Sequence, residues 1–260
     1  TQLADVNGTP GGTSMYGYRL LDDYGKIFSP GNKFNSEAIF EIVHTSLANG
    51  GWGSWPNFEG NLAVLMFGPR GYSGPTYEAG WGFNPLTQDL VNALTGDPRF
   101  EHTVLDIKNV PDAVYEPSFD DTGYFIKKYA PTTEWLSTGG GDVILNYPHN
   151  YIEMRLADTY LMEAEALVQA GGNSARAGEL LNAVRARVGL APVAPTLENI
   201  YRERRLELAT EGHRFYDLVR TGRAATVLAP MGFVAGKHEV LPIPQNELIN
   251  TKLVQNPEYR

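Results

Sequence analysis

Residues 203–214 read Glu203-Arg204-Arg205-Leu206-Glu207-Leu208-Ala209-Thr210-Glu211-Gly212-His213-Arg214. When this stretch is extended back to residue 197 and placed on a helix, one face is apolar and is formed by Leu197, Ile200, Tyr201 and Leu208. Arg204 and Glu211 fall inside the same arc, and a charge on an apolar face has to be paired. We therefore predict an internal ion-pair network with the nearby Arg214 and Asp217 that ties this helix to the next. The alternative is an anion site for a substrate carboxylate or sulfate.

Upstream of this region, residues 151–188 have the pattern of two helices joined by a short turn. Apolar side chains of residues 151–170 cover about half of a helical circumference, which indicates contact with more than one neighbour. Gly171-Gly172 ends this helix, and Asn173 or Ser174 caps the next one. The apolar stripe of the second helix is Ala177, Leu180, Leu181, Val184 and Val188.

This helical hairpin resembles one tetratricopeptide-type repeat of about 34 residues. Such a repeat cannot bury its faces alone, and roughly three are normally needed. The sequence shows one good copy. Either the other repeats lie outside this chain, or the hairpin packs on the rest of it.

Residues 1–149 differ from the helical part, because short runs alternate with loops rich in Gly, Pro, Asn and aromatic residues. We predict strands at 38–43, 62–67 and 123–129, and a short helix at 85–94 capped by Asn84. The predicted fold is therefore mainly α: a tetratricopeptide-type helical hairpin scaffold with a loop-rich α+β subdomain. The predicted division is a loop-rich segment at 1–149, the candidate ligand face, and a helical segment at 150–260.

Composition excludes several classes of function. The net charge of -9 over 260 residues argues against a nucleic-acid partner, which needs a basic surface. The absence of cysteine excludes disulfides and thiolate nucleophiles. No apolar run approaches about 18 residues, so the sequence predicts no membrane span.

Motifs for catalysis are also weak. Gly71-Tyr72-Ser73-Gly74 has the wrong spacing for a nucleophile elbow, and residues 232–238 are one residue short of a P-loop. The five histidines show no metal-ligand spacing. A calcium site with oxygen ligands remains as an alternative. We predict no catalytic residue, no metal and no cofactor. A carboxylate pair for glycoside hydrolysis remains as the rival enzyme hypothesis, because separation in space is the deciding test.

Aromatic residues are the better candidates for a binding site. Trp52, Trp55, Tyr72, Tyr77 and Trp81 lie within about 30 residues, interleaved with Gly, Pro and Asn. Flat rings on irregular loops suit the apolar faces of sugar rings, with Asn or Asp binding hydroxyl groups beside them. We predict that the ligand-binding residues are Trp52, Trp55, Tyr72 and Trp81. The alternative is that these rings anchor the loops to the helical scaffold.

Several motifs recur in this order in a known family. After the hairpin and the 203–214 stretch come Leu241-Pro242-Ile243-Pro244 and Gln255-Asn256-Pro257-Glu258-Tyr259, and look-alikes occur upstream at 35–41, 82–90 and 96–99. Together they resemble the C-terminal half of the SusD/RagB family of nutrient-binding lipoproteins. The motifs are mainly structural, so they identify a fold better than a ligand.

The resemblance implies non-catalytic capture of glycans at the cell surface, with delivery to a SusC-like TonB-dependent transporter in the outer membrane. Oligopeptide capture by the same architecture is the alternative. The family would place the protein on the extracellular face, lipid-anchored through a segment not present in this chain. It also implies that the N-terminal half, with further repeats, is missing or is supplied by a partner chain.

Overall fold

The computed structural model describes residues 2–47, 50–53 and 59–260. The chain divides into two compact units, residues 1–210 and residues 211–260. The division predicted at residue 149 does not coincide with this boundary. The reason is strand pairing: Tyr151–Arg155 pairs antiparallel with Ala38–Ile42, which joins the two predicted segments within one unit.

The first unit alternates short helices and strands before its longer helices. Its elements are α1 (Gln2–Asn7), β1 (Ala38–Ile42), α2 (Leu62–Phe67), α3 (Gln88–Leu94), α4 (Phe100–Thr103), β2 (Val104–Asp106), β3 (Tyr124–Ile126), β4 (Tyr151–Arg155), α5 (Leu156–Gln169), α6 (Ser174–Arg187) and α7 (Leu197–Glu207). The second unit contains α8 (His213–Arg220), α9 (Ala224–Val227) and α10 (Gln245–Leu248). None of the helices in the described ranges is long and apolar enough to cross a membrane.

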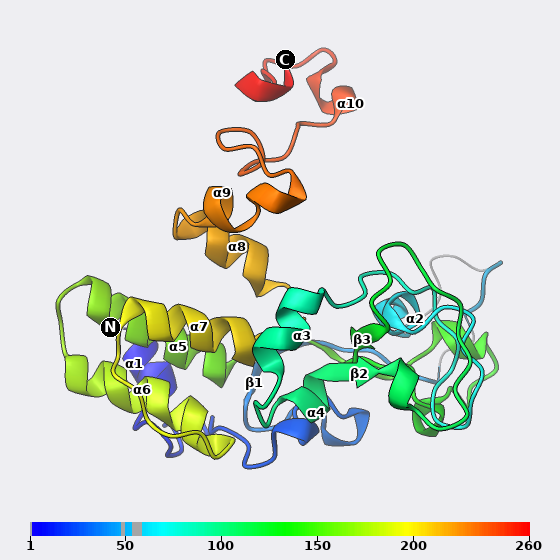
Figure 1. Ribbon diagram of the computed structural model, residues 1–260, viewed down its shortest axis with the longest axis horizontal. Helices are drawn as coiled ribbons and strands as arrows, with labels where there is room; N and C mark the ends of the chain where they lie inside the picture. Colours follow the sequence, from blue (N-terminus) through cyan, green and yellow to red (C-terminus); the bar gives the residue numbers. More distant parts are fainter. Residues whose placement is uncertain (1, 48–49, 54–58) are drawn as a thin grey trace. The chain divides into compact units, whose positions relative to one another are not determined.

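The helical hairpin is confirmed as α5 and α6, which pack side by side with α7 and α1 (Figure 1). Gly171 adopts a φ of 61° at the turn, and the Asn173 side chain accepts a hydrogen bond from the Arg176 N–H at 3.1 Å. Of the predicted stripe, Ala177, Leu180, Leu181 and Val184 are fully buried, whereas Val188 follows the end of α6 and is half-buried. The hairpin is thus covered partly by helices of this same chain.

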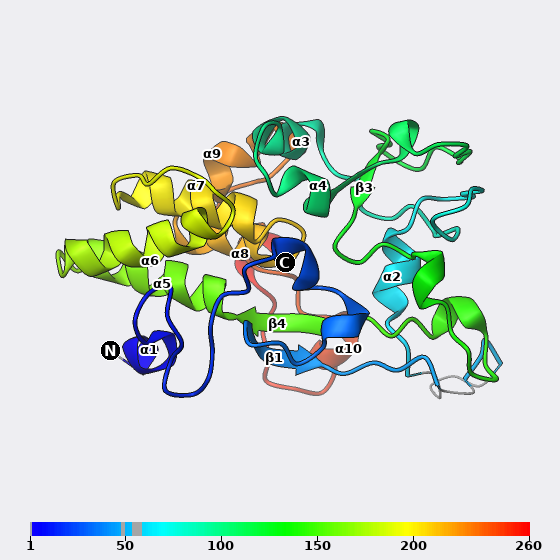
Figure 2. The same cartoon turned by 90° about the horizontal axis from the view of Figure 1, so that it is seen from below.

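The first five residues of the predicted hairpin are not helical. Tyr151–Arg155 forms β4, which pairs with β1 in the register Ile42 with Tyr151 and Ala38 with Arg155 (Figure 2). The apolar residues of this short segment fit either period, so periodicity alone could not distinguish strand from helix.

The buried charge on the apolar face of α7 has a structural partner. Arg204 is 4% exposed, and its Nη1 lies 2.7 Å from Asp158 Oδ1 on α5. Internal pairing of Arg204 is confirmed, but its partner Asp158 lies on the hairpin. The predicted partners Arg214 and Asp217 belong to the second unit, and their pairing with Arg204 stays a prediction. Because the guanidinium is buried, it is not an accessible anion site.

Two predictions in the loop-rich part were wrong in detail. Residues 62–67 form helix α2 rather than a strand, because the Asn61 side chain caps the helix by accepting from the Ala63 N–H at 3.0 Å. The helix predicted at 85–94 begins only at Gln88, with Thr87 as its N-cap. The Leu86 N–H donates to the Tyr124 carbonyl at 2.8 Å, which holds the preceding residues outside the helix.

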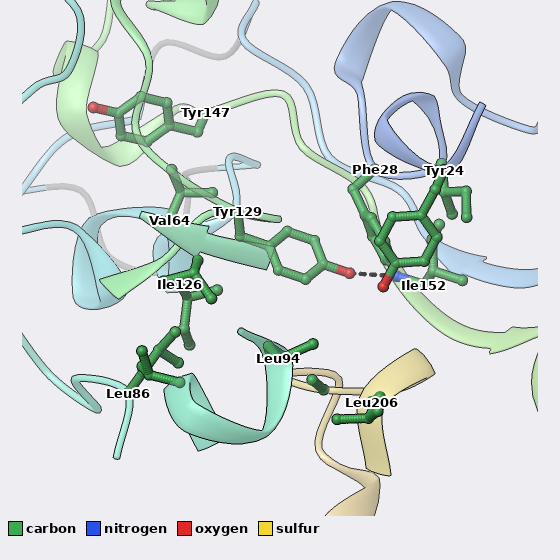
Figure 3. Packing of buried hydrophobic residues seen from close by; sticks show 14 of the residues in the cluster. Tyr24, Phe28, Val64, Leu86, Leu94, Ile126, Tyr129, Tyr147, Ile152 and Leu206 are labelled. Carbon is green, nitrogen blue, oxygen red and sulfur yellow. Dashed lines mark hydrogen bonds between the residues drawn. The ribbon is translucent and has the colours of Figure 1, made fainter. Parts of the chain in front are cut away.

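A buried core joins the loop-rich part to the helices (Figure 3). Val64 of α2, Leu94 of α3 and Leu206 of α7 belong to one cluster with the fully buried rings of Tyr129 and Tyr147. The Ile152 N–H donates to Tyr129 Oη at 3.4 Å, shown as a dashed line. This core fixes α2, and α2 in turn positions the candidate site.

Candidate functional site

Three aromatic side chains form a continuous surface beside α2. Trp52 is 56% exposed and stacks on Trp81, with ring centroids 6.1 Å apart and planes at 25°. Trp81 contacts the exposed Phe83, with centroids 5.5 Å apart and planes at 57°. We call Trp52, Trp81 and Phe83 the aromatic platform. Trp52 and Phe83 are exposed and Trp81 between them is half-buried, so the three rings offer flat apolar area to a ligand.

The end of α2 holds two of these rings in place. The Trp81 N–H donates to the Leu65 carbonyl and the Phe83 N–H donates to the Met66 carbonyl, each at 2.9 Å. The last carbonyl groups of a helix lack partners within the helix, so a neighbouring chain segment can satisfy them. Trp81 and Phe83 are therefore attached to a packed helix although they lie on an irregular segment.

Trp52 is held by a different part of the chain. Its N–H donates to Asp142 Oδ2 at 2.8 Å. Asn146 Nδ2 donates to the Gly50 carbonyl at 3.0 Å, and the Gly50 carbonyl also accepts from the Asp142 N–H at 3.1 Å. A methyl group at position 51 would lie 2.5 Å from Asp142 Oδ2, so glycine permits this close approach.

Asp142→Ala is expected to weaken ligand binding about five- to thirtyfold, because one neutral-to-charged hydrogen bond that orders Trp52 contributes roughly 1–2 kcal/mol. Titration calorimetry measures the affinity. Asp142→Asn is the matched control, since its amide oxygen can still accept from the Trp52 N–H, and it should retain most of the affinity. Equal affinity of all three proteins would show that Asp142 does not position the ring.

A cavity of about 710 Å³ adjoins the platform. Its walls include Trp81, Phe83 and the 87% exposed Phe119, and its polar lining includes Arg70, Gln88 and Asp120. This volume lies within the range of about 300–1,000 Å³ typical of ligand pockets, which combine apolar walls with a few polar groups.

The structure brings together only part of the predicted site. Trp52 and Trp81 lie on the platform. The structure contradicts the predicted role of Tyr72 in ligand binding. Tyr72 is 6% exposed and packs edge to face on Tyr77 in a core cluster, with ring centroids 5.9 Å apart. Its ring cannot stack on a ligand, because its neighbours already cover it. Trp55 lies outside the described residues.

The sequence does not single out Phe83 and Phe119. Each is a single aromatic residue in a polar segment, and exposed and buried rings look alike in such a context. The look-alike motif at 82–90 contains Phe83, but such motifs identify a fold better than a ligand. Among residues 2–47, 50–53 and 59–260, no three His, Asp or Glu side chains gather in a way that could hold a metal ion.

Fold and surface together define a helical-hairpin protein with an exposed aromatic surface. The model of the SusD family matches residues 108–235. SusD-like protein P25 of Formosa agariphila is 28% identical over 92% of this chain and 51% of its own length. SusD-like protein P38 of the same organism is 34% identical over 58% of this chain and 36% of its own length.

Solved structures agree with these sequence matches. A laminarin binding SusD-like protein is 53% identical with a TM-score of 0.94, over 99% of this chain and 57% of that one. Surface glycan-binding protein A from Bacteroides thetaiotaomicron, in complex with laminarihexaose, is 32% identical with a TM-score of 0.86, over 98% of this chain and 58% of that one. The chain belongs to the SusD family, and it spans about half the length of the first curated relative and of these structures.

Proposed function

We propose that this chain contributes a non-catalytic glycan-binding site, formed by the aromatic platform and the adjoining cavity. The stacked pair of Trp52 and Trp81 carries the proposal, because the half-buried Trp81 supports an indole ring of Trp52 that is 56% exposed to water. Sugar rings have apolar faces that can cover such a surface, and the cavity supplies polar groups for their hydroxyls. The laminarin binding and laminarihexaose-bound neighbours support this choice of ligand class.

Trp52→Ala is expected to weaken binding of an oligosaccharide by about 1–3 kcal/mol, roughly 5- to 150-fold, taking base stacking as the nearest measured analogue. Because Trp52 is 56% exposed, its replacement should change folding little. Tyr16→Ala is the control, since Tyr16 is 58% exposed and lies outside the platform and the cavity. Calorimetric titration with a panel of neutral oligosaccharides gives the affinities, and circular dichroism checks the fold.

Normal glycan affinity of a folded Trp52→Ala variant would contradict this site assignment. Tight peptide binding without retention in any glycan-loaded gel would instead favour oligopeptide capture. Release of shortened products, abolished by one Asp or Glu substitution, would favour hydrolysis. Among the described residues that line the cavity, Asp120 alone carries a carboxylate, whereas glycoside hydrolysis generally needs two.

The family also supports a role in delivery. We infer that the whole protein acts on the extracellular face of the outer membrane, lipid-anchored, and passes glycans to a SusC-like TonB-dependent transporter. Copurification with such a transporter from outer membranes tests this inference. Recovery of the protein in the soluble fraction alone would contradict it.

A further inference from the structure

The cavity beside the platform is assembled from three separate chain segments. Gly82 lies where they meet, with a φ of 69°. A methyl group at this position would lie 2.8 Å from Ser118 Cβ and 3.0 Å from Arg70 Cβ. The absence of a side chain at Gly82 therefore lets the segment that carries Phe119 approach the segment that carries Phe83.

Phe119 is the most exposed large apolar side chain among the described residues, at 87%. Burial of such a large apolar ring is favourable, so a ring left in water forgoes that stabilisation. Phe119 lines the same cavity as Trp81 and Phe83, but it comes from a different loop. A ligand in the cavity thus meets aromatic surface from two loops.

The charged side chains that line the cavity carry no net positive charge. Arg70 and Asp120 are the charged residues among the described lining. Arg70 Nε lies 3.5 Å from Glu116 Oε2, so a second carboxylate accompanies the one cation. Lys108 contacts the Thr122 carbonyl at 3.3 Å but is not part of the lining. An anionic group in the cavity would meet the Arg70 guanidinium and the Asp120 carboxylate, and Glu116 beside Arg70 offsets the charge of the guanidinium.

The remaining polar lining suits hydroxyl groups. Asn84 and Gln88 carry amides, which both donate and accept hydrogen bonds. Gln88 Nε2 donates to Asn92 Oδ1 at 2.8 Å, which orients this amide. Sugar hydroxyls also donate and accept, so they match this set of groups better than a carboxylate or sulfate, which only accepts.

We propose that this cavity is a subsite for an uncharged pyranose residue, with Phe119 as a stacking ring and with Arg70 and Asp120 binding its hydroxyl groups. The proposal rests on the glycan-binding function proposed above and adds discrimination against acidic sugars. Specificity of this kind comes from repulsion as well as attraction, and Asp120 and Glu116 supply the repulsion.

The test uses one oligosaccharide in two forms. Neutral glucose oligosaccharides of β-1,3, β-1,4 and α-1,4 linkage are titrated first, and the tightest binder is compared with its C6-oxidised, uronate-containing counterpart. We expect the oxidised form to bind at least about tenfold more weakly, and the affinity of the neutral form to be insensitive to salt. Phe119→Ala should weaken binding of the neutral form about tenfold without changing the fold.

A charge variant supplies an independent readout. In Glu116→Gln combined with Asp120→Asn, Arg70 keeps its charge and both carboxylates are gone. This double variant should bind the oxidised form several-fold more tightly than the wild type does, and a purely structural role of the two residues would not produce that gain.

Equal or tighter binding of the oxidised form by the wild type would overturn the subsite while leaving glycan binding intact. Unchanged affinity of Phe119→Ala for the neutral form would do the same. If the wild type bound none of the oligosaccharides, the proposed function itself would fail and the subsite with it.

Discussion

Replacing Glu207 by Gln is expected to lower the free energy of unfolding by about 3–5 kcal/mol, the range for breaking a buried ion pair from one side. Glu207 is fully buried at the end of α7. Its Oε2 accepts from Arg99 Nη1 at 2.9 Å, and its Oε1 accepts from Arg155 Nη1 at 2.6 Å and from Arg187 Nη2. One carboxylate thus joins α7 to three other parts of the chain.

The electrostatics explain the size of this effect. Burial alone would raise the pKa of the Glu207 carboxyl, but Arg187, Arg155 and Arg99 together hold that pKa well below its usual value. Gln keeps the shape of the side chain and loses the charge. Three buried guanidinium groups would then have fewer counter-charges, and an uncompensated buried charge is costly.

Asp22→Asn is the control for this experiment. Arg19 and Asp22 form a surface pair at 3.8 Å, with side chains 49% and 94% exposed, and such pairs contribute about 0–1 kcal/mol. Urea unfolding followed by circular dichroism measures both variants. If Glu207→Gln unfolded within about 1 kcal/mol of the wild type, the three arginines would have found other partners, and the network would not be essential.

The sequence predicted that a charge on the apolar face of α7 must be paired, and Arg204 confirms this. It did not predict the partners of Glu207, because Arg99 and Arg155 lie far away along the chain. A helical stripe shows that a charged residue faces inward, but long-range partners depend on tertiary packing. The same limit explains why Tyr151–Arg155 was assigned to a helix: its β-strand depends on β1, more than 100 residues earlier.

The candidate binding surface was predictable to a similar extent. The clustering of tryptophans on glycine-rich loops identified Trp52 and Trp81, which the structure places together on the surface. Tyr72 has the same sequence context, yet it is buried against Tyr77. Composition locates a region rich in rings, whereas the exposure of each ring depends on which neighbour covers it.

Acidification is expected to destabilise the first unit before its carboxylates titrate, and His149 supplies the cause. This side chain is 3% exposed, and burial, followed by the nearby Lys33 and His44, lowers its pKa from 6.5 to about 4. In the unfolded chain His149 therefore binds a proton near pH 6.5, whereas in the folded protein it binds one only near pH 4. At about 1.4 kcal/mol per pH unit, the stability contributed by neutral His149 falls by about 3 kcal/mol across this window.

The sign follows from the lowered pKa: this contribution is complete above pH 6.5 and is lost as the pH falls toward 4. Burial also lowers the pKa of His44, which adds a loss in the same direction. His149→Gln has no proton to take up, so its stability should fall between pH 8 and pH 4.5 by about 2–3 kcal/mol less than that of the wild type. Urea unfolding at both pH values makes pH 8 the internal reference, because any packing cost of the glutamine is the same at both.

Parallel losses in the two proteins would mean that His149 is protonated in the folded state near its ordinary pKa. The acid sensitivity would then come from carboxylates such as Glu207, whose lowered pKa places their loss of stability below about pH 4.5.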